Sequence, residues 1–390
     1  MMKKSILTLK DGLEEYISSK NSSSFKKYHG NRTCYEAYVE LKRNLAPIQE
    51  NVTTGAMAEA IRTLTDSYSE KIRAIINEIP EKDEQIARIH ELFAADPVLF
   101  LNDHGPEHIN MVIERANSIV SNFSAHPLSE FEAFILLCAM QIHDIGNILG
   151  RAGHERKLSS IFDEKSANII IDTPERRVIK SIAMAHGGKT ENGKDTISLL
   201  SARETIFNEI VRTRLLAAIL RFADELADDN TRANRPALDL GILGTNSDIF
   251  HKYSRALHTV AIEPDEENKD FKVSLVFELE APALKERYLV GNHEKYLLDE
   301  IYDRTKKMEL ERRYCMKFMY PYINIGRIQV VINIYGAQSQ LIRPISYTLE
   351  DVSYPNDAVV VRNGKIGNIS VPSGKEMLDA LVKRGEIDEE

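Results

Sequence analysis

Histidines and aspartates beside long apolar stretches are the residues with the most chemistry in this sequence. Burial of an imidazole or a carboxylate is costly unless another group satisfies it. A divalent cation would satisfy all of them at once, because neutral imidazole nitrogens and carboxylate oxygens are ligands for Fe, Mn, Co, Ni or Zn. The residues concerned are His108, His143, Asp144, His186 and Asp224.

The adjacent pair His143 and Asp144 follows the uncharged stretch "FILLCAMQI" of residues 134–142. Neighbouring residues are about 100° apart around a helix, so both side chains can face one ion only where the helix ends. Gly146 is expected to provide that end. A helical bundle can place one ligand on each of several helices, and the apolar stretch would anchor this pair.

Apolar periodicity and capping signals predict an all-helical block over residues 100–230. Pro106 fits a first helical turn, and Ser129 and Thr173 are the expected N-caps. The predicted helices lie within residues 101–123, 126–144, 173–188 and 203–229. Residues 1–100 are also expected to be mostly helical, with apolar spacing in residues 33–44 and 57–79.

After residue 229 the pattern changes to the alternation typical of strands. Residues 258–279 predict a hairpin, residues 293–316 a helix and residues 327–336 a further strand, with candidate strands at 345–350 and 358–364. The last dozen residues are expected to be solvated. The sequence therefore predicts a mainly α protein with three parts: an N-terminal helical region (1–100), a metal-binding helical bundle (101–235) and a smaller α+β domain (236–390).

Composition narrows the function classes. The formal net charge of −9 argues against a dedicated binder of duplex nucleic acid, but allows a small anionic substrate. Three cysteines without paired spacing favour a reducing cytoplasm. The N-terminal apolar run is too short for a signal peptide, and no run approaches the roughly 18 apolar residues of a membrane span. We therefore expect a soluble, cytoplasmic protein with no membrane partner.

The order of these residues resembles the H…HD…D signature of HD-domain metal-dependent phosphohydrolases, and "HDIG" at 143–146 is a common form of the motif. The stretches "RAGHERKLSSIF", "AMAHGG" and "LRFADELADDNTRANR" resemble a bacterial HD branch sometimes found in conflict-associated proteins, which implies a role in antiviral defence. The similarity covers about residues 100–235. It implies an HD-domain fold, one or two divalent ions (Mn, Fe, Co, Ni, Mg or Zn) and a homo-oligomer.

The resemblance assigns ligand roles residue by residue. A first ion would be held by the four signature residues His108, His143, Asp144 and Asp224. In two-metal members the Asp of the pair bridges to a second ion held by later histidines, and His154 and His186 occupy those positions. In one-metal members such histidines instead contact phosphates or exchange protons, which would make these two catalytic. His104 would contact the metal ligands without binding the ion itself, or would have a structural role.

Two departures separate the chain from better-known branches. Triphosphohydrolases carry a His directly after HDxG, where this chain has Asn147, and His154 lies ten residues after Asp144. The motif "HHExxDGxGYP" is replaced by "AHGGKTENG". A cyclic-di-GMP phosphodiesterase of the GYP type is therefore not expected, and similarity to dNTP triphosphohydrolases is distant.

The mechanism implied is attack of metal-activated water on phosphorus, with cations stabilising charge on the phosphate oxygens. Arg221 is the favoured cation, because it lies three residues before Asp224 on nearly the same helix face. The other candidates are Arg151, Arg156, Lys189 and Arg232. The leading interpretation is hydrolysis of a nucleotide, with a (deoxy)nucleoside triphosphate first. The alternatives are a phosphodiesterase of a cyclic or oligonucleotide messenger and a non-catalytic nucleotide-binding sensor.

Overall fold

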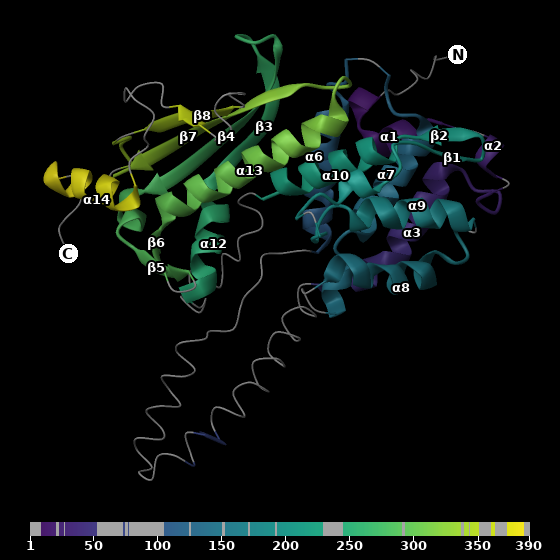
Figure 1. Cartoon of the computed structure of the whole chain (residues 1–390), viewed down its shortest axis with the longest axis horizontal. Coiled ribbons are helices and arrows are strands. Elements are labelled where there is room, and N and C mark those ends of the chain that lie inside the picture. The colour runs from purple at the N-terminus through teal and green to yellow at the C-terminus, as the bar shows by residue number, and fades with distance from the viewer. Residues whose placement is uncertain are drawn as a thin grey trace.

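The computed structural model combines a helical body with a C-terminal region built on a mixed sheet (Figure 1). The structure describes residues 9–20, 23–26, 28–52, 73–74, 77, 105–124, 126–149, 153–170, 172–191, 193–228, 245–290, 293–336, 339–342, 344–350, 360–362 and 373–385. The predicted mainly α fold class is confirmed. Four predictions fall wholly or mostly outside these residues: the helix over 57–79, His104, Arg151 and Arg232.

Helix α7, Glu130–Ile142, is the centre of the helical body. Every residue from Phe131 to Ile142 is buried. The helices that pack against it are α1 (Leu13–Ser18), α3 (Cys34–Gln49), α6 (Pro106–Val120), α9 (Thr173–Met184) and α10 (Thr213–Leu226). The shorter α2 (Ser23–Lys26) and helix α8 (His154–Ser166) complete this body. A helix that is apolar on all sides is thus held rigidly by its neighbours.

The segment Glu130–Leu149, which contains α7, has the length and composition of a membrane span. No such segment was expected from the sequence, and that expectation was wrong by length and composition. In the structure, 89% of the window that meets them is buried inside the protein. Burial among the surrounding helices accounts for its apolar composition.

The predicted N-caps lie at, or within one residue of, the observed starts of α7 and α9. Ser129 accepts a hydrogen bond from the backbone of Glu132, whose side chain accepts one in return, so the predicted cap of α7 is confirmed. The cap of α9 is Asp172 rather than Thr173, which is the first helical residue. The aspartate carboxylate accepts from the backbone of Glu175 and displaces the predicted cap by one position.

The prediction of an all-helical block was wrong over residues 204–211. Strands β1 (Glu204–Ile206) and β2 (Glu209–Val211) form an antiparallel hairpin there, and α10 starts only at Thr213. Phe207 and Asn208 both have positive φ, as the favoured two-residue hairpin turn requires. Thr, Ile and Val in "ETIFNEIV" also favour strand over helix.

The C-terminal sheet has the order β3-β4-β7-β8-β9. Its strands span Leu257–Asp265, Asp270–Glu280, Ile325–Tyr335, Ile345–Glu350 and Val360–Arg362. The predicted hairpin is β3–β4, and the predicted later strands are β7, β8 and β9. Only β4 and β7 pair in parallel among these neighbours, which requires a long connection between them.

That connection contains the long helix α13, Leu297–Met319, which crosses from the sheet to the helical body (Figure 1). The predicted helix started four residues too early, because residues 293–296 form strand β6 against β5, Arg287–Val290. Helix α12, Thr245–Ala256, and helix α14, Gly374–Lys383, complete the region. The expected solvated end was wrong at Leu381 of α14, which is buried. Helix α13 packs along α10, the helix that carries Asp224.

Candidate metal centre

Five elements bring six of the predicted ligands together. Helix α6 supplies one histidine, the turn after α7 supplies the HD pair, α8 and the turn after α9 supply one histidine each, and α10 supplies one aspartate. Five of them meet the separations of metal ligands, namely His108, His143, Asp144, His154 and His186, and the sixth, Asp224, contacts the first two histidines. Their imidazole nitrogens and carboxylate oxygens form two adjoining clusters.

The first cluster lies between α6, α7 and α10. The Nε2 atom of His108 is 3.2 Å from Oδ1 of Asp224 and 3.6 Å from Oδ2 of Asp144. The Nε2 atom of His143 is 3.5 Å from the same Asp144 oxygen and 3.7 Å from the same Asp224 oxygen. The two nitrogens and the Asp144 oxygen therefore face one common point, and the Asp224 oxygen lies beside both nitrogens.

The second cluster uses the other oxygen of the same carboxylate. Oδ1 of Asp144 is 3.1 Å from Nε2 of His154 and 3.6 Å from Nε2 of His186. The two Nε2 atoms are 3.3 Å apart. Asp144 thus lies between the clusters, with one oxygen turned to each.

These atoms fit a metal ion. His143 and His186 each donate Nδ1–H to a carbonyl one helical turn back, that of Met140 at 2.8 Å and that of Ala183 at 2.6 Å. This leaves each Nε2 with a lone pair directed into the centre. Nε2 of His143 is buried and makes no hydrogen bond with any described residue. Ligand atoms that each lie about 2.0–2.2 Å from a shared cation are separated from one another by about the distances observed here. Each cluster could therefore hold an ion.

The electrostatics of the first cluster favour a bound cation. Burial lowers the pKa of His143, but the carboxylates of Asp144 and Asp224 outweigh it and raise that pKa to about 9. Burial raises the pKa of Asp224, but the imidazoles of His108 and His143 that face its carboxylate outweigh this effect and hold that pKa well below its usual range. The centre thus attracts positive charge, and a divalent ion would take the place of the imidazole protons.

Gly146 has a different role from the one predicted. Helix α7 already ends at Ile142, and Gly146 lies in the 3-10 turn that follows. A Cβ atom at Gly146 would lie 2.0 Å from the backbone oxygen of His154 and 3.0 Å from the backbone nitrogen of Leu158. The glycine therefore lets the start of α8 approach the HD turn, which places His154 beside Asp144.

A Gly146→Ala variant should displace α8 and destabilise the fold by about 1–3 kcal/mol. We expect metal analysis to show loss of the ion held by His154 and His186, with the ion of the first cluster retained. The matched control is Gly326→Ala, where an added Cβ would have no neighbour closer than 4.0 Å. Full metal content in Gly146→Ala would contradict this role.

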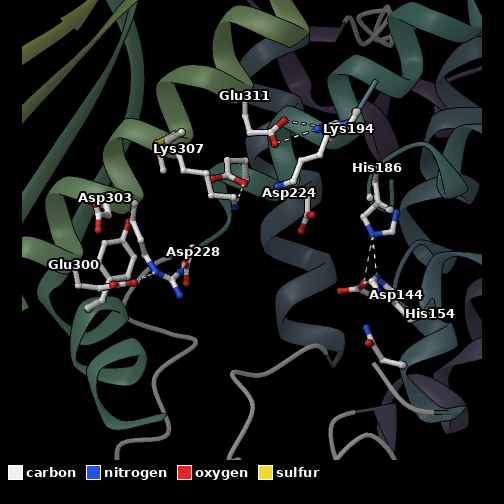
Figure 2. A pocket seen from close by; sticks show the side chains of 18 of the residues that line it. Asp144, His154, His186, Lys194, Asp224, Asp228, Glu300, Asp303, Lys307 and Glu311 are labelled. Carbon is white, nitrogen blue, oxygen red and sulfur yellow. Dashed lines mark hydrogen bonds and ion pairs between the residues drawn. The ribbon is translucent and has the colours of Figure 1, made fainter. Parts of the chain in front are cut away.

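The centre opens into a pocket of about 580 Å³ (Figure 2). Asp144, His154 and His186 lie on one side, and residues of α13 such as Lys307 lie on the other. Asp224 lies between them. Asn147 also lines the pocket, and its buried Oδ1 makes no hydrogen bond with any described residue. A substrate in this pocket would reach both clusters.

Arg221 lines the pocket, but its guanidinium is engaged. Nε and Nη2 donate to the carboxylate of Glu311 at 2.8 and 3.0 Å. Nη1 donates to the backbone oxygen of Lys194 and to the hydroxyl of Thr196. The predicted contact of Arg221 with phosphate stays a prediction, and the structure gives it a second task in holding the 194–196 segment.

Two further candidate cations lie elsewhere. Arg156 and Lys189 are exposed, and neither lines the pocket. Lys194 and the α13 residues Lys307 and Glu311 also line the pocket, and none of them was predicted from the sequence. Lys194 lies in a segment without periodicity, and α13 belongs to a region with no resemblance to the motif. The one signal available was the alternation of charges along α13.

Comparison with known proteins gives one match. A family model described as HD-CE matches residues 91–307, which is more than half of the chain. No curated protein and no solved structure matches.

Proposed function

We propose that this chain, which belongs to the HD-CE family and carries an HD domain, is a metal-dependent phosphohydrolase that cleaves a phosphoester or phosphoanhydride bond of a nucleotide. One observation carries the proposal. The two oxygens of Asp144 are divided between two clusters of nitrogen and oxygen donors, and both clusters border a polar pocket.

Divalent cations bound in these clusters would lower the pKa of a water ligand towards neutrality and offset negative charge on phosphate oxygens. The chain's own residues supply the rest. Helices α6, α7 and α10 fix the donors of the first cluster, so little reorganisation accompanies the reaction. In the alternative with one ion, His154, which is 20% exposed at its side chain and lies on the pocket side, would exchange a proton with a bound phosphate group instead of holding a second ion.

The proposed substrate is a nucleotide, with a (deoxy)nucleoside triphosphate first. Support comes from the resemblance of the motif and from the pocket, whose volume lies in the range of sites for small molecules. Homo-oligomerisation, a cytoplasmic location and a role in antiviral defence stay predictions.

Hydrolysis of a nucleotide panel tests the proposal. The protein is loaded with Mn, Fe, Co or Mg and offered deoxynucleoside and nucleoside triphosphates, monophosphates and cyclic dinucleotides. We expect metal-dependent release of phosphate or pyrophosphate from at least one triphosphate. Cleavage of cyclic dinucleotides alone would favour the phosphodiesterase alternative. Bound metal and bound nucleotide without any hydrolysis would overturn the proposal in favour of a sensor.

A further inference from the structure

Helices α10 and α13 run antiparallel, and ion pairs connect them. The partners are spaced by four and three residues along α10 and the two residues that follow it, and by the same steps in opposite order along α13, so they form one line along the contact. This ion-pair ladder consists of Arg221–Glu311 at 2.8 Å, Glu225–Lys307 at 2.7 Å and Asp228–Arg304 at 2.6 Å. All six residues line the pocket, on the side away from the histidines.

Among the described residues, every cation of this half of the pocket is paired with a carboxylate. Lys295, beyond the end of the ladder, is also paired, with Glu300 at 2.6 Å and Asp303 at 2.7 Å. Carboxylates and paired cations suit hydroxyl and amino groups, which both donate and accept hydrogen bonds. They suit a phosphate poorly, because each cation already has an anionic partner.

Lys194 is different. It lines the pocket and makes no ion pair with any described residue. Figure 2 shows its side chain extending from beside Glu311 towards Asp224, at the border between the metal centre and the ladder. A lysine ammonium is a compact point charge that commonly binds phosphate oxygens.

The backbone that carries Lys194 is fixed from two helices. Its carbonyl accepts a hydrogen bond from Arg221 of α10 at 2.9 Å. The next residue, Asp195, accepts from the hydroxyl of Tyr314 of α13 at 2.7 Å. Thr196 donates to the carbonyl of Ala185, beside the metal-centre histidine, at 2.7 Å. A positioned backbone, together with an ammonium that has no ion-pair partner in the part of the chain that the structure describes, is the arrangement expected of a ligand-binding residue.

From this arrangement we propose the orientation in which the substrate binds in the pocket. Its phosphate lies between the metal centre and Lys194, and its sugar and base lie along the ion-pair ladder of α10 and α13. The inference rests on the proposed function and deepens it, since it names Lys194 as the phosphate-binding residue and α13 as the nucleoside subsite. The C-terminal region is then part of the binding site.

The phosphate end is tested by calorimetry of the Mn²⁺-loaded protein with inorganic phosphate and with the 5′-monophosphates of adenosine, guanosine, cytidine and thymidine. Lys194→Ala should lower the affinities for inorganic phosphate and for the best-binding monophosphate by the same factor, about tenfold or more, because one charge-assisted hydrogen bond is lost. Lys194→Arg should restore most of the affinity. Lys189→Ala, an exposed lysine of the same loop that does not line the pocket, should change neither affinity.

The nucleoside end needs different variants. Asp303 is 69% exposed at its side chain, so its replacement should leave the fold intact. Lys307→Met leaves Glu225, which is 16% exposed, without its cation, so the fold of this variant is checked by denaturant unfolding. Asp303→Ala and Lys307→Met should lower the affinity for the monophosphate several-fold and leave the affinity for inorganic phosphate unchanged. Lys306→Met is the matched control, because Lys306 is exposed on α13 and does not line the pocket.

The outcomes separate the two proposals. The direction of binding alone would be overturned if Lys194→Ala left the phosphate affinity unchanged. It would also be overturned if the α13 variants lowered the affinities for phosphate and monophosphate equally. Failure of the metal-loaded wild-type protein to bind phosphate or any monophosphate would overturn the proposed function, and the direction with it.

Discussion

Replacing Asp144 with Ala should remove both ions and reduce nucleotide hydrolysis about 10³-fold or more. The reason is the position of this carboxylate, which gives one oxygen to each cluster. Each other donor serves a single cluster. No other single substitution in the centre should therefore have so large an effect on metal content.

Metal analysis and activity measured on the same samples check this result. His154→Ala is the informative comparison, because it should lose the ion of the second cluster and retain that of the first. Asp163→Ala is the control, since this exposed residue of α8 makes only a surface ion pair with Lys180. Retention of two ions per chain in Asp144→Ala, or activity within tenfold of the wild type, would contradict the bridging role.

Glu311→Ala should destabilise the protein by about 3 kcal/mol, because it leaves the guanidinium of Arg221 buried without its anion. The two side chains are only 6% and 11% exposed, and they share two hydrogen bonds. The same change should loosen the segment that carries Lys194, which Arg221 holds through its backbone oxygen. Denaturant unfolding measures the first effect and calorimetry with inorganic phosphate the second.

A double variant separates stability from binding. Arg221→Met combined with Glu311→Leu removes both charges, so most of the lost stability should return. Phosphate affinity should stay low, because the anchor of the Lys194 segment is still missing. Glu204→Ala is the control, since it breaks an ion pair with Arg177 at the surface. A loss below about 1 kcal/mol in Glu311→Ala would show that the pair is not needed.

Much of the helical body could be predicted from the sequence. Apolar spacing and a capping box are local signals, and they locate α6 and α7 well. Five of the six predicted ligands lie on, or directly after, a helix that the sequence predicted, and only His154 lies on a helix that was not predicted, α8. The error at residues 204–211 arose where "ETIFNEIV" was assigned to the long helix despite its strand-forming residues.

The α13 wall of the pocket could not be found in this way. The contact between α10 and α13 joins Arg221 to a residue 90 positions later, and no local pattern in the chain encodes that distance. The role of Gly146 was misjudged for a related reason. Its constraint comes from the backbone of His154, a tertiary contact, rather than from the end of its own helix.

The position of metal ions in crystals grown with Mn²⁺, located by anomalous diffraction, tests the central claim most directly. We expect two anomalous peaks on either side of the Asp144 carboxylate, one among His108, His143 and Asp224 and the other between His154 and His186. A structure in which no ion contacts Asp144 would contradict the account.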